Sequence, residues 1–213
     1  MRAFRRLIVV ALTAGTLSGL VWFGLQCFTV IPLIETAETY ETAASHDHQD
    51  HGARLGRNSL TALTTVLTAI GFAAVLFGVV SLTGRRLDAK SGALWGLAAF
   101  ACIGVAPALG LPPQPPGTAV ADLASRQWWW LGTVVATGLG FYWITGSARP
   151  PLRISVGIVC LLLPHVIGAP VAVGENVVPP SLVRQFEVAS LAAAGVFWLM
   201  LGAVGDFLGK DRR

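Results

Sequence analysis

Six long stretches without Asp, Glu, Lys or Arg constrain this chain more than any other feature. They lie between Arg6 and Glu35, Arg57 and Arg85, Lys90 and Asp122, Arg126 and Arg149, Arg153 and Glu175, and Glu187 and Asp206. Crossing a hydrocarbon core of roughly 30 Å takes about 20 apolar residues in a helix. Only 12% of the 213 residues are charged, about half the usual share of a soluble domain. The sequence therefore predicts an all-α integral membrane protein.

We expect about six transmembrane helices in a single membrane domain over residues 1–213. The predicted helices cover residues 7–34, 59–83, 91–109, 127–148, 154–173 and 188–206, and a His- and acid-rich outer loop covers residues 35–57. A cleaved signal has an apolar region of about 7–15 residues and a small-residue cleavage site. The first run here is longer and lacks such a site, so we expect a retained first helix.

The distribution of basic residues predicts that both chain ends lie inside. Cytoplasmic loops of membrane proteins carry an excess of Lys and Arg. With the N-terminus inside, the inner segments hold eleven of the fifteen basic residues, and the outer segments hold eight of the eleven acidic ones. Six spans satisfy this rule at every loop, whereas five would break the alternation. The net charge of +4 thus reflects topology and does not indicate a nucleic-acid partner.

Short inner connections predict three antiparallel hairpins, each closed on the outer side: helices 1–2, 3–4 and 5–6. At each outer corner a basic residue and an amide open the returning helix, at Arg57-Asn58, Arg126-Gln127 and Arg184-Gln185. If this pattern is a true internal repeat, the three arginines converge on one face and order acidic residues or neutralise an anion. The alternative is that each arginine simply reaches the lipid head groups.

The predicted outer loop concentrates residues that bind metal ions. Three of the four histidines, His46, His48 and His51, fall within six residues. Glu35, Glu38 and Glu41 precede them at a spacing that places all three on one face of a continuing helix. Imidazole and carboxylate groups together bind first-row divalent metals, without selecting cobalt among them. A solvated linker with incidental histidines is the alternative.

His165 is the fourth histidine, and the sequence places it near the middle of the fifth helix, after Pro164. An ionisable residue at membrane depth is costly and usually faces a cavity or a partner. It is thus a candidate for an intramembrane ligand or relay, and a simple hydrogen bond to a neighbouring helix is the alternative. The run Trp128–Trp130 favours an anchor at the membrane interface.

Several motifs are missing from the chain. It contains no nucleotide-binding P-loop, nucleophile elbow or H-E-x-x-H zinc motif. We therefore expect no enzymatic activity and no tightly bound cofactor, and any energy for transport comes from a partner, the membrane potential or an ion gradient.

Three segments give the chain a family resemblance. They are Pro-x-Ile-Glu-x-Ala-Glu-x-Tyr-Glu at 32–41, Ala-Pro-Ala-Leu-Gly-Leu-Pro-Pro-x-Pro-Pro-Gly at 106–117 and Arg-Gln-x-Trp-Trp at 126–130. Together with the basic N-terminus and the histidine cluster, they resemble the CbtA family of predicted cobalt transporter subunits. That family is often drawn with five spans, whereas the charge pattern here predicts six.

The resemblance implies a bacterial inner-membrane permease for cobalt, accompanied by a small single-span, His-containing subunit called CbtB. It points to Glu35, Glu38, Glu41, His46, His48 and His51 as residues that capture the transported metal. We expect the ion to pass from them between the helices, with His165 lining the path, and the path to lie within one chain or within a homo-oligomer. The alternative is a non-transporting accessory, such as a metal sensor or an assembly protein.

Overall fold

The computed structural model describes residues 2–42, 51–83, 88–146 and 151–210, with side chains described for residues 4–41, 56–83, 88–146 and 151–205. The described residues form helices and connecting segments, with no strand among them. The helices are α1 (Arg2–Thr29), α2 (Ile31–Thr42), α3 (His51–Leu82), α4 (Ala89–Phe100), the π-helical turn η1 (Ala101–Val105), α5 (Ala106–Ala108), α6 (Leu123–Thr145), α7 (Pro151–Ile167) and α8 (Pro180–Lys210). The expected all-helical class is therefore confirmed.

Several helix limits differ from those expected. The predicted outer loop 35–57 is helical on both sides of the segment 43–50, since α2 runs to Thr42 and α3 begins at His51. The predicted helix 188–206 begins earlier, at Pro180, and α8 has 31 residues. The expected helix limits were set at charged residues. Arg57, Arg184 and Glu187 nevertheless lie within helices, because a helix can continue beyond the apolar layer of the membrane.

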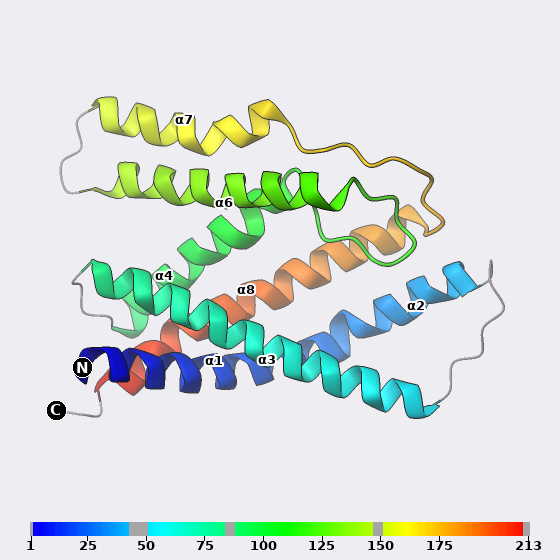
Figure 1. Ribbon diagram of the computed structural model, residues 1–213, viewed down its shortest axis with the longest axis horizontal. Helices are drawn as coiled ribbons and strands as arrows, with labels where there is room; N and C mark the ends of the chain where they lie inside the picture. Colours follow the sequence, from blue (N-terminus) through cyan, green and yellow to red (C-terminus); the bar gives the residue numbers. More distant parts are fainter. Residues whose placement is uncertain (1, 43–50, 84–87, 147–150, 211–213) are drawn as a thin grey trace.

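The helices share one common direction, and the chain reverses at two opposite ends (Figure 1). The start of α1 and the end of α8 lie at the same end as the last residues of α3 and α6 and the first residues of α4 and α7. We call this the proximal end. The opposite, distal end holds the end of α2, the starts of α3, α6 and α8, and the segments 109–122 and 168–179.

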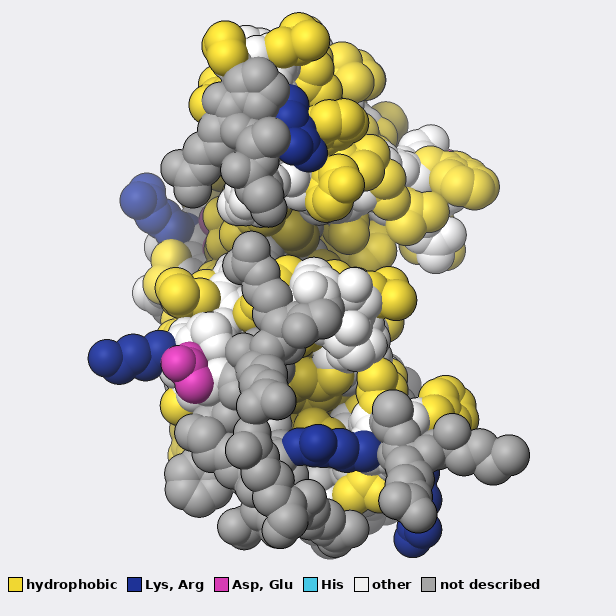
Figure 2. Space-filling model, turned by 90° about the vertical axis from the view of Figure 1, so that its left-hand side faces the viewer, with side chains coloured by type: hydrophobic (Ala, Val, Ile, Leu, Met, Phe, Trp, Pro, Cys, Tyr) yellow, Lys and Arg dark blue, Asp and Glu magenta, His cyan; other side chains and the backbone are white. Residues whose placement is uncertain are grey.

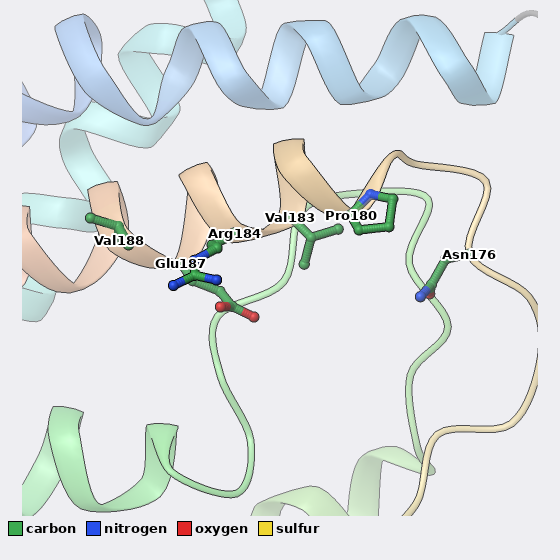
Figure 3. A pocket seen from close by; sticks show the side chains of 6 residues that line it. All are labelled: Asn176, Pro180, Val183, Arg184, Glu187 and Val188. Atoms are coloured by element: carbon green, nitrogen blue, oxygen red, sulfur yellow. The ribbon is translucent and has the colours of Figure 1, made fainter.

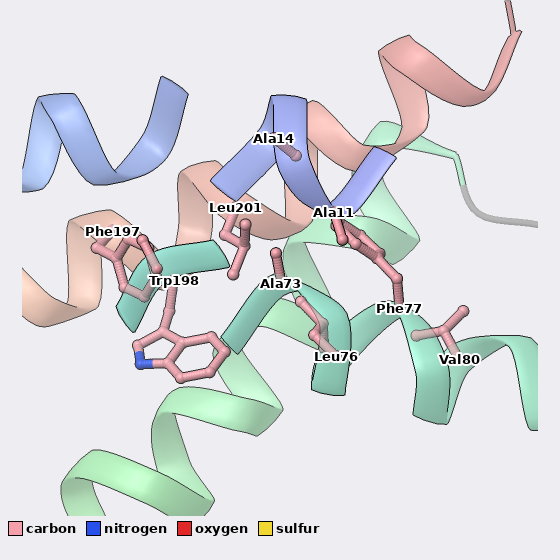
Figure 4. Close-up of a cluster of buried hydrophobic side chains, with 10 residues drawn as sticks. Ala11, Ala14, Ala73, Leu76, Phe77, Val80, Phe197, Trp198 and Leu201 are labelled. Atoms are coloured by element: carbon pink, nitrogen blue, oxygen red, sulfur yellow. The ribbon is translucent and has the colours of Figure 1, made fainter. Parts of the chain in front are cut away.

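The main apolar core lies between α1, α3 and α8 (Figure 4). Its buried residues are Ala11, Ala14, Ala69, Ala73, Leu76, Phe77, Val80, Phe197, Trp198 and Leu201. Phe197 is fully buried, and its ring stacks on Trp22 with 4.5 Å between ring centroids. Small residues on α1 and α3 let these helices approach closely, as is usual in membrane bundles: a Cβ added to Gly15 would lie 2.6 Å from the Cα of Ile70.

Glycines also bring α4 and α8 together. A Cβ added to Gly92 would collide with the carbonyl of Gly202, and one added to Gly96 would collide with the carbonyl of Trp198. Backbone-to-backbone packing of this kind depends on the absence of side chains, because the axes could not otherwise come so close. The helix before η1 is therefore fixed against the C-terminal helix.

The pairing of helices corrects part of the hairpin prediction. The first predicted hairpin is present, since α1 packs along α3. In the second, α4 packs on α8, and only the η1–α5 end of the predicted helix 91–109 meets α6; in the third, α7 packs on α6. The α5–η1 segment contacts α6, whereas α7 and α8 are not in contact over the described residues. Thus α6 and α7 form a separate antiparallel pair beside the bundle of α1, α3, α4 and α8 (Figure 1).

Among the described residues, four helical segments are long and apolar enough to cross a membrane: Phe4–Thr29, Gly56–Leu82, Ala89–Ala108 and Pro180–Gly205. Helix α6 has 23 residues, which is long enough to cross, but it is not one of these four segments. Helix α7 is apolar but has only 17 residues, about 25 Å at about 1.5 Å each. The end view in Figure 2 shows abundant hydrophobic side chains on the outer surface and basic side chains spread over the proximal end.

Candidate functional site

An acidic face on α2 meets the start of α3 at the distal end. Glu35, Glu38 and Glu41 lie on α2, and Arg57 lies in the second turn of α3. Nη1 of Arg57 donates to both carboxylate oxygens of Glu38, at 2.8 and 2.9 Å. Nη2 of Arg57 lies 3.7 Å from Oε1 of Glu35. One guanidinium thus bridges two of the three carboxylates that the sequence predicts to bind metal.

The charge balance of this acidic face favours a cation. The face carries three carboxylates, and the guanidinium of Arg57 contacts two of them. The Arg57 and Glu38 side chains are 36% and 24% exposed, so solvent still reaches both groups. Carboxylate oxygens are ligands for divalent metals. A metal ion binding to Glu38 would compete with Arg57 for the same two oxygen atoms.

The histidines of the predicted capture site are only partly placed. His46 and His48 lie outside the described residues. His51 is the first residue of α3, and its side chain is also outside the described set. Within the described part of the chain, no group of three or more His, Cys, Asp or Glu side chains is arranged to hold a metal ion. Metal binding by these six residues therefore stays a prediction.

Two long connections are joined at the distal end. The amide of Val177 donates to the carbonyl of Gly117 at 3.1 Å, and the amide of Ala119 donates to Oδ1 of Asn176 at 2.8 Å. Gly117 has a φ of 77°, and a Cβ there would lie 3.2 Å from Cγ of Glu41. Because residue 117 is a glycine, the Pro-rich segment 109–122 can turn there and lie against both the segment 168–179 and the end of the acidic face.

A first cavity of about 490 Å³ lies beside the start of α8. Its lining residues are Asn176, Pro180, Val183, Arg184, Glu187 and Val188. Figure 3 shows Arg184 and Glu187 projecting from α8 toward the same space. No ion pair within 4.0 Å joins these two side chains in the described structure, so both charges are available to groups that enter the cavity.

A second cavity of about 610 Å³ lies between the η1–α5 segment, the start of α6 and α8. Arg126, Gln127 and Gln114 supply its polar groups, and Ile103, Trp130, Leu131 and Leu191 supply apolar walls. The π-helical turn η1 contributes Ile103 and Gly104, and such turns occur often at functional sites. Arg126, which the sequence predicts at an outer corner between two helices, is one of the residues that line this cavity.

One face of α8 connects the two cavities. Val183 and Glu187 line the first, and Ser190, Leu191 and Ala194 line the second. These residues recur at spacings of three and four, which places them along one helical stripe. Sequence reasoning used Glu187 only as a helix limit and did not select Gln114 or Ser190. For Ser190, the signal available in the sequence was a polar residue at helical spacing within an apolar run.

His165 lies away from both cavities. It is in the last turn of α7, which ends at Ile167, so the expectation of a position near mid-helix is wrong. Its ring meets Trp129 of α6 edge-on, with 6.1 Å between centroids. A Cβ added to Gly110 would lie 2.5 Å from the Trp129 ring. His165 thus belongs to a packed contact between α6, α7 and the segment after α5.

The chain was compared with known families, curated proteins and solved structures. No curated protein and no solved structure matches it. A family model described as "Probable cobalt transporter subunit (CbtA)" matches residues 4–209, which include every described helix that contributes to the distal end. A match over nearly the whole chain shows the family: this protein belongs to the CbtA family of probable cobalt transporter subunits.

Proposed function

We propose that this protein is the membrane-spanning subunit of a divalent-metal uptake permease, with cobalt as the transported ion. The family match over residues 4–209 supports the cobalt substrate and the term subunit. The acidic face of α2 is the structural observation that carries the capture step. It gathers Glu35 and Glu38 around Arg57 at the end of the molecule away from the chain termini.

In this proposal the protein lies in the bacterial inner membrane with both termini in the cytoplasm. Basic residues at the proximal end support that orientation, because Lys and Arg concentrate on the cytoplasmic side. The distal end then faces outward. Six passes require α6 and α7 to cross with the four long apolar helices, and the packing of α6 against α7 as a pair supports their insertion together.

Capture would begin with attraction of the metal ion to the acidic face. Carboxylates clustered on one face raise the local concentration of cations. Imidazoles of His46, His48 and His51 would then replace part of the hydration shell, while Glu35, Glu38 and Glu41 supply oxygen ligands. No catalytic step and no tightly bound cofactor is needed, since the metal is cargo.

A second protein component would complete the permease. The family description itself calls its members subunits. We propose a small single-span, His-containing partner, which would accept the captured ion, or a homo-oligomer whose protomers form the passage between them. Lipid would cover the remaining apolar surface.

Metal accumulation in cells tests the proposed function. Cells lacking other cobalt importers would express this protein with and without its partner, and labelled cobalt uptake would be measured with nickel and zinc as competitors. We expect uptake to depend on the protein and to fall at least about fivefold in Glu38→Gln and in the triple His46/His48/His51→Ala variant, because each removes metal ligands.

Glu175→Gln is the matched control, since Glu175 is an exposed carboxylate in the segment before α8. It removes the same charge outside the acidic face and should leave uptake unchanged. Membrane levels of each variant would be compared by immunoblot. If no protein-dependent uptake occurs even with the partner present, the permease proposal is wrong and a non-transporting accessory is favoured.

A further inference from the structure

The 610 Å³ cavity has a chemistry that differs from that of the acidic face. Among the described residues that line it, Arg126 is the one charged side chain, and none carries a carboxylate, imidazole or thiol. A divalent cation would meet a fixed positive charge there and no strong ligand. This cavity therefore does not belong to the proposed metal-capture site, and it is suited to an anion.

Arg126 has no structural partner that accounts for its charge. It is half-buried at the start of α6, and its guanidinium makes no hydrogen bond or ion pair to any other described residue. A partly buried guanidinium without an anion is energetically unfavourable. Its planar set of N–H donors matches the oxygens of a phosphate group in a bidentate arrangement.

Other polar groups of the cavity can also bind an anion. Gln114 and Gln127 line it with Arg126 and carry amide N–H donors. Ser190 is another lining residue, and its buried Oγ has no hydrogen-bond partner in the described structure. A buried hydroxyl usually has a partner, so Ser190 is an unsatisfied polar group beside the cavity.

The remaining walls are apolar. Ile103, Leu131 and Leu191 face the same space, and Trp130 stands beside the polar groups. Tryptophan concentrates at the level of lipid head groups. An amphipathic cavity at the end of membrane helices fits a molecule with a charged head and a hydrocarbon tail better than it fits a free inorganic anion.

We propose that this cavity binds the phosphate head group of an anionic phospholipid, with Arg126 as the principal contact. The first part of an acyl chain would lie along Ile103, Leu131 and Leu191. The bound lipid would fill the space between α6 and α8, two helices that do not pack directly on each other. It would thereby connect the α6–α7 pair to the rest of the bundle.

Thermal stability of the full-length protein in nonionic detergent tests this proposal. Phosphatidylglycerol, phosphatidylcholine and soluble glycerol phosphate would be titrated separately, and the concentration giving half of the maximal stabilisation would be measured. We expect phosphatidylglycerol to raise the melting temperature, and phosphatidylcholine and glycerol phosphate to leave it unchanged. In Arg126→Gln that concentration should rise about tenfold, because a charge-assisted contact is lost.

Three further variants separate a specific site from general charge or misfolding. Arg5→Gln removes an exposed positive charge at the proximal end and should bind phosphatidylglycerol as the unmodified protein does. Ala194→Leu fills the apolar part of the cavity and should weaken binding without changing charge. Arg126→Lys keeps the charge but not the bidentate geometry and should bind with intermediate affinity.

Two results would overturn the lipid site. Equal binding of phosphatidylglycerol by the unmodified protein and Arg126→Gln, when both melt in a single transition, would exclude Arg126 as the contact. Equal stabilisation by glycerol phosphate and phosphatidylglycerol would show a site for free phosphate esters, with no role for the apolar walls.

Discussion

Arg57 at the start of α3 forms an ion pair with Glu38 of α2. Both carboxylate oxygens of Glu38 accept from Nη1 of Arg57, at 2.8 and 2.9 Å. The pair joins α2 to α3 on either side of the segment 43–50, which contains His46 and His48. The pair also occupies oxygens that the proposed metal would use.

Removal of Arg57 should strengthen metal binding. In Arg57→Gln the acidic face loses one positive charge, and Glu38 loses the guanidinium contact to both of its carboxylate oxygens. We expect the cobalt affinity of the purified protein to rise about three- to tenfold, as measured by titration calorimetry. Glu38→Gln should lower it. Equal affinity in Arg57→Gln and the unmodified protein would show that metal does not compete with this ion pair.

The same substitution should change the stability only slightly. An ion pair this exposed contributes up to about 1 kcal/mol, so Arg57→Gln should remain folded and its affinity can be interpreted directly. The double variant Arg57→Gln/Glu38→Gln completes a thermodynamic cycle, which isolates the coupling between the two side chains.

His165 should tolerate an aromatic replacement. Its ring packs edge-on against Trp129, and it lines neither of the two cavities described above. We expect His165→Phe to retain at least about half of the cobalt uptake, whereas His165→Ala leaves a gap and loses stability. Uptake and the melting temperature would be measured for both. Equal loss of uptake in both stable variants would instead support the intramembrane metal ligand that the sequence predicts.

A methyl group at Gly202 should separate α4 from α8. A Cβ there would overlap the carbonyl oxygen of Gly92. We expect Gly202→Ala to destabilise the protein by about 1–3 kcal/mol, measured by unfolding in detergent. Gly71→Ala is the control, because nothing lies within 4 Å of its added Cβ. That variant should be neutral or slightly more stable, since alanine favours helix.

Acid should weaken the start of α6. Asp122 caps this helix, and hydrogen bonds from the backbone amide and the hydroxyl of Ser125, at 3.0 and 3.1 Å, lower its pKa below the ordinary value of 3.8. A carboxylate with a lowered pKa stabilises the fold above that ordinary value and loses its effect as the pH falls through the folded pKa.

Hydrogen exchange in the first turn of α6 measures this cap. We expect faster exchange in Asp122→Ala at neutral pH and a smaller difference from the unmodified protein at a pH below the folded pKa of Asp122, where the carboxyl is protonated. Asp122→Asn keeps a side-chain acceptor and should remain protected at both pH values. A constant difference between the unmodified protein and Asp122→Ala across this range would contradict the assigned role of the carboxylate.

The sequence predicted much of the distal end but not its contacts. Residues 35–57 were expected to form a loop, whereas Glu35, Glu38 and Glu41 lie on α2, a helix that continues beyond the first apolar run. The sequence did not reveal that Arg57 would bind Glu38, since several side chains could reach that face. The cavity residues Gln114 and Ser190 were also missed, because each comes from a different segment and gains significance only when those segments meet.

The sequence by itself determined that the chain is helical and rich in membrane-spanning segments, because uncharged apolar runs of this length have few other stable arrangements. Tertiary structure alone decided which helices pack together. By composition, either α3 or α8 could pack against α4. Gly92 and Gly96 of α4 meet the backbone of α8 near Gly202, and the absence of side chains there lets α4 approach α8 closely. Which distant segments fit together is decided only when the chain folds. That packing puts Arg126 in the lining of a cavity and His165 against Trp129.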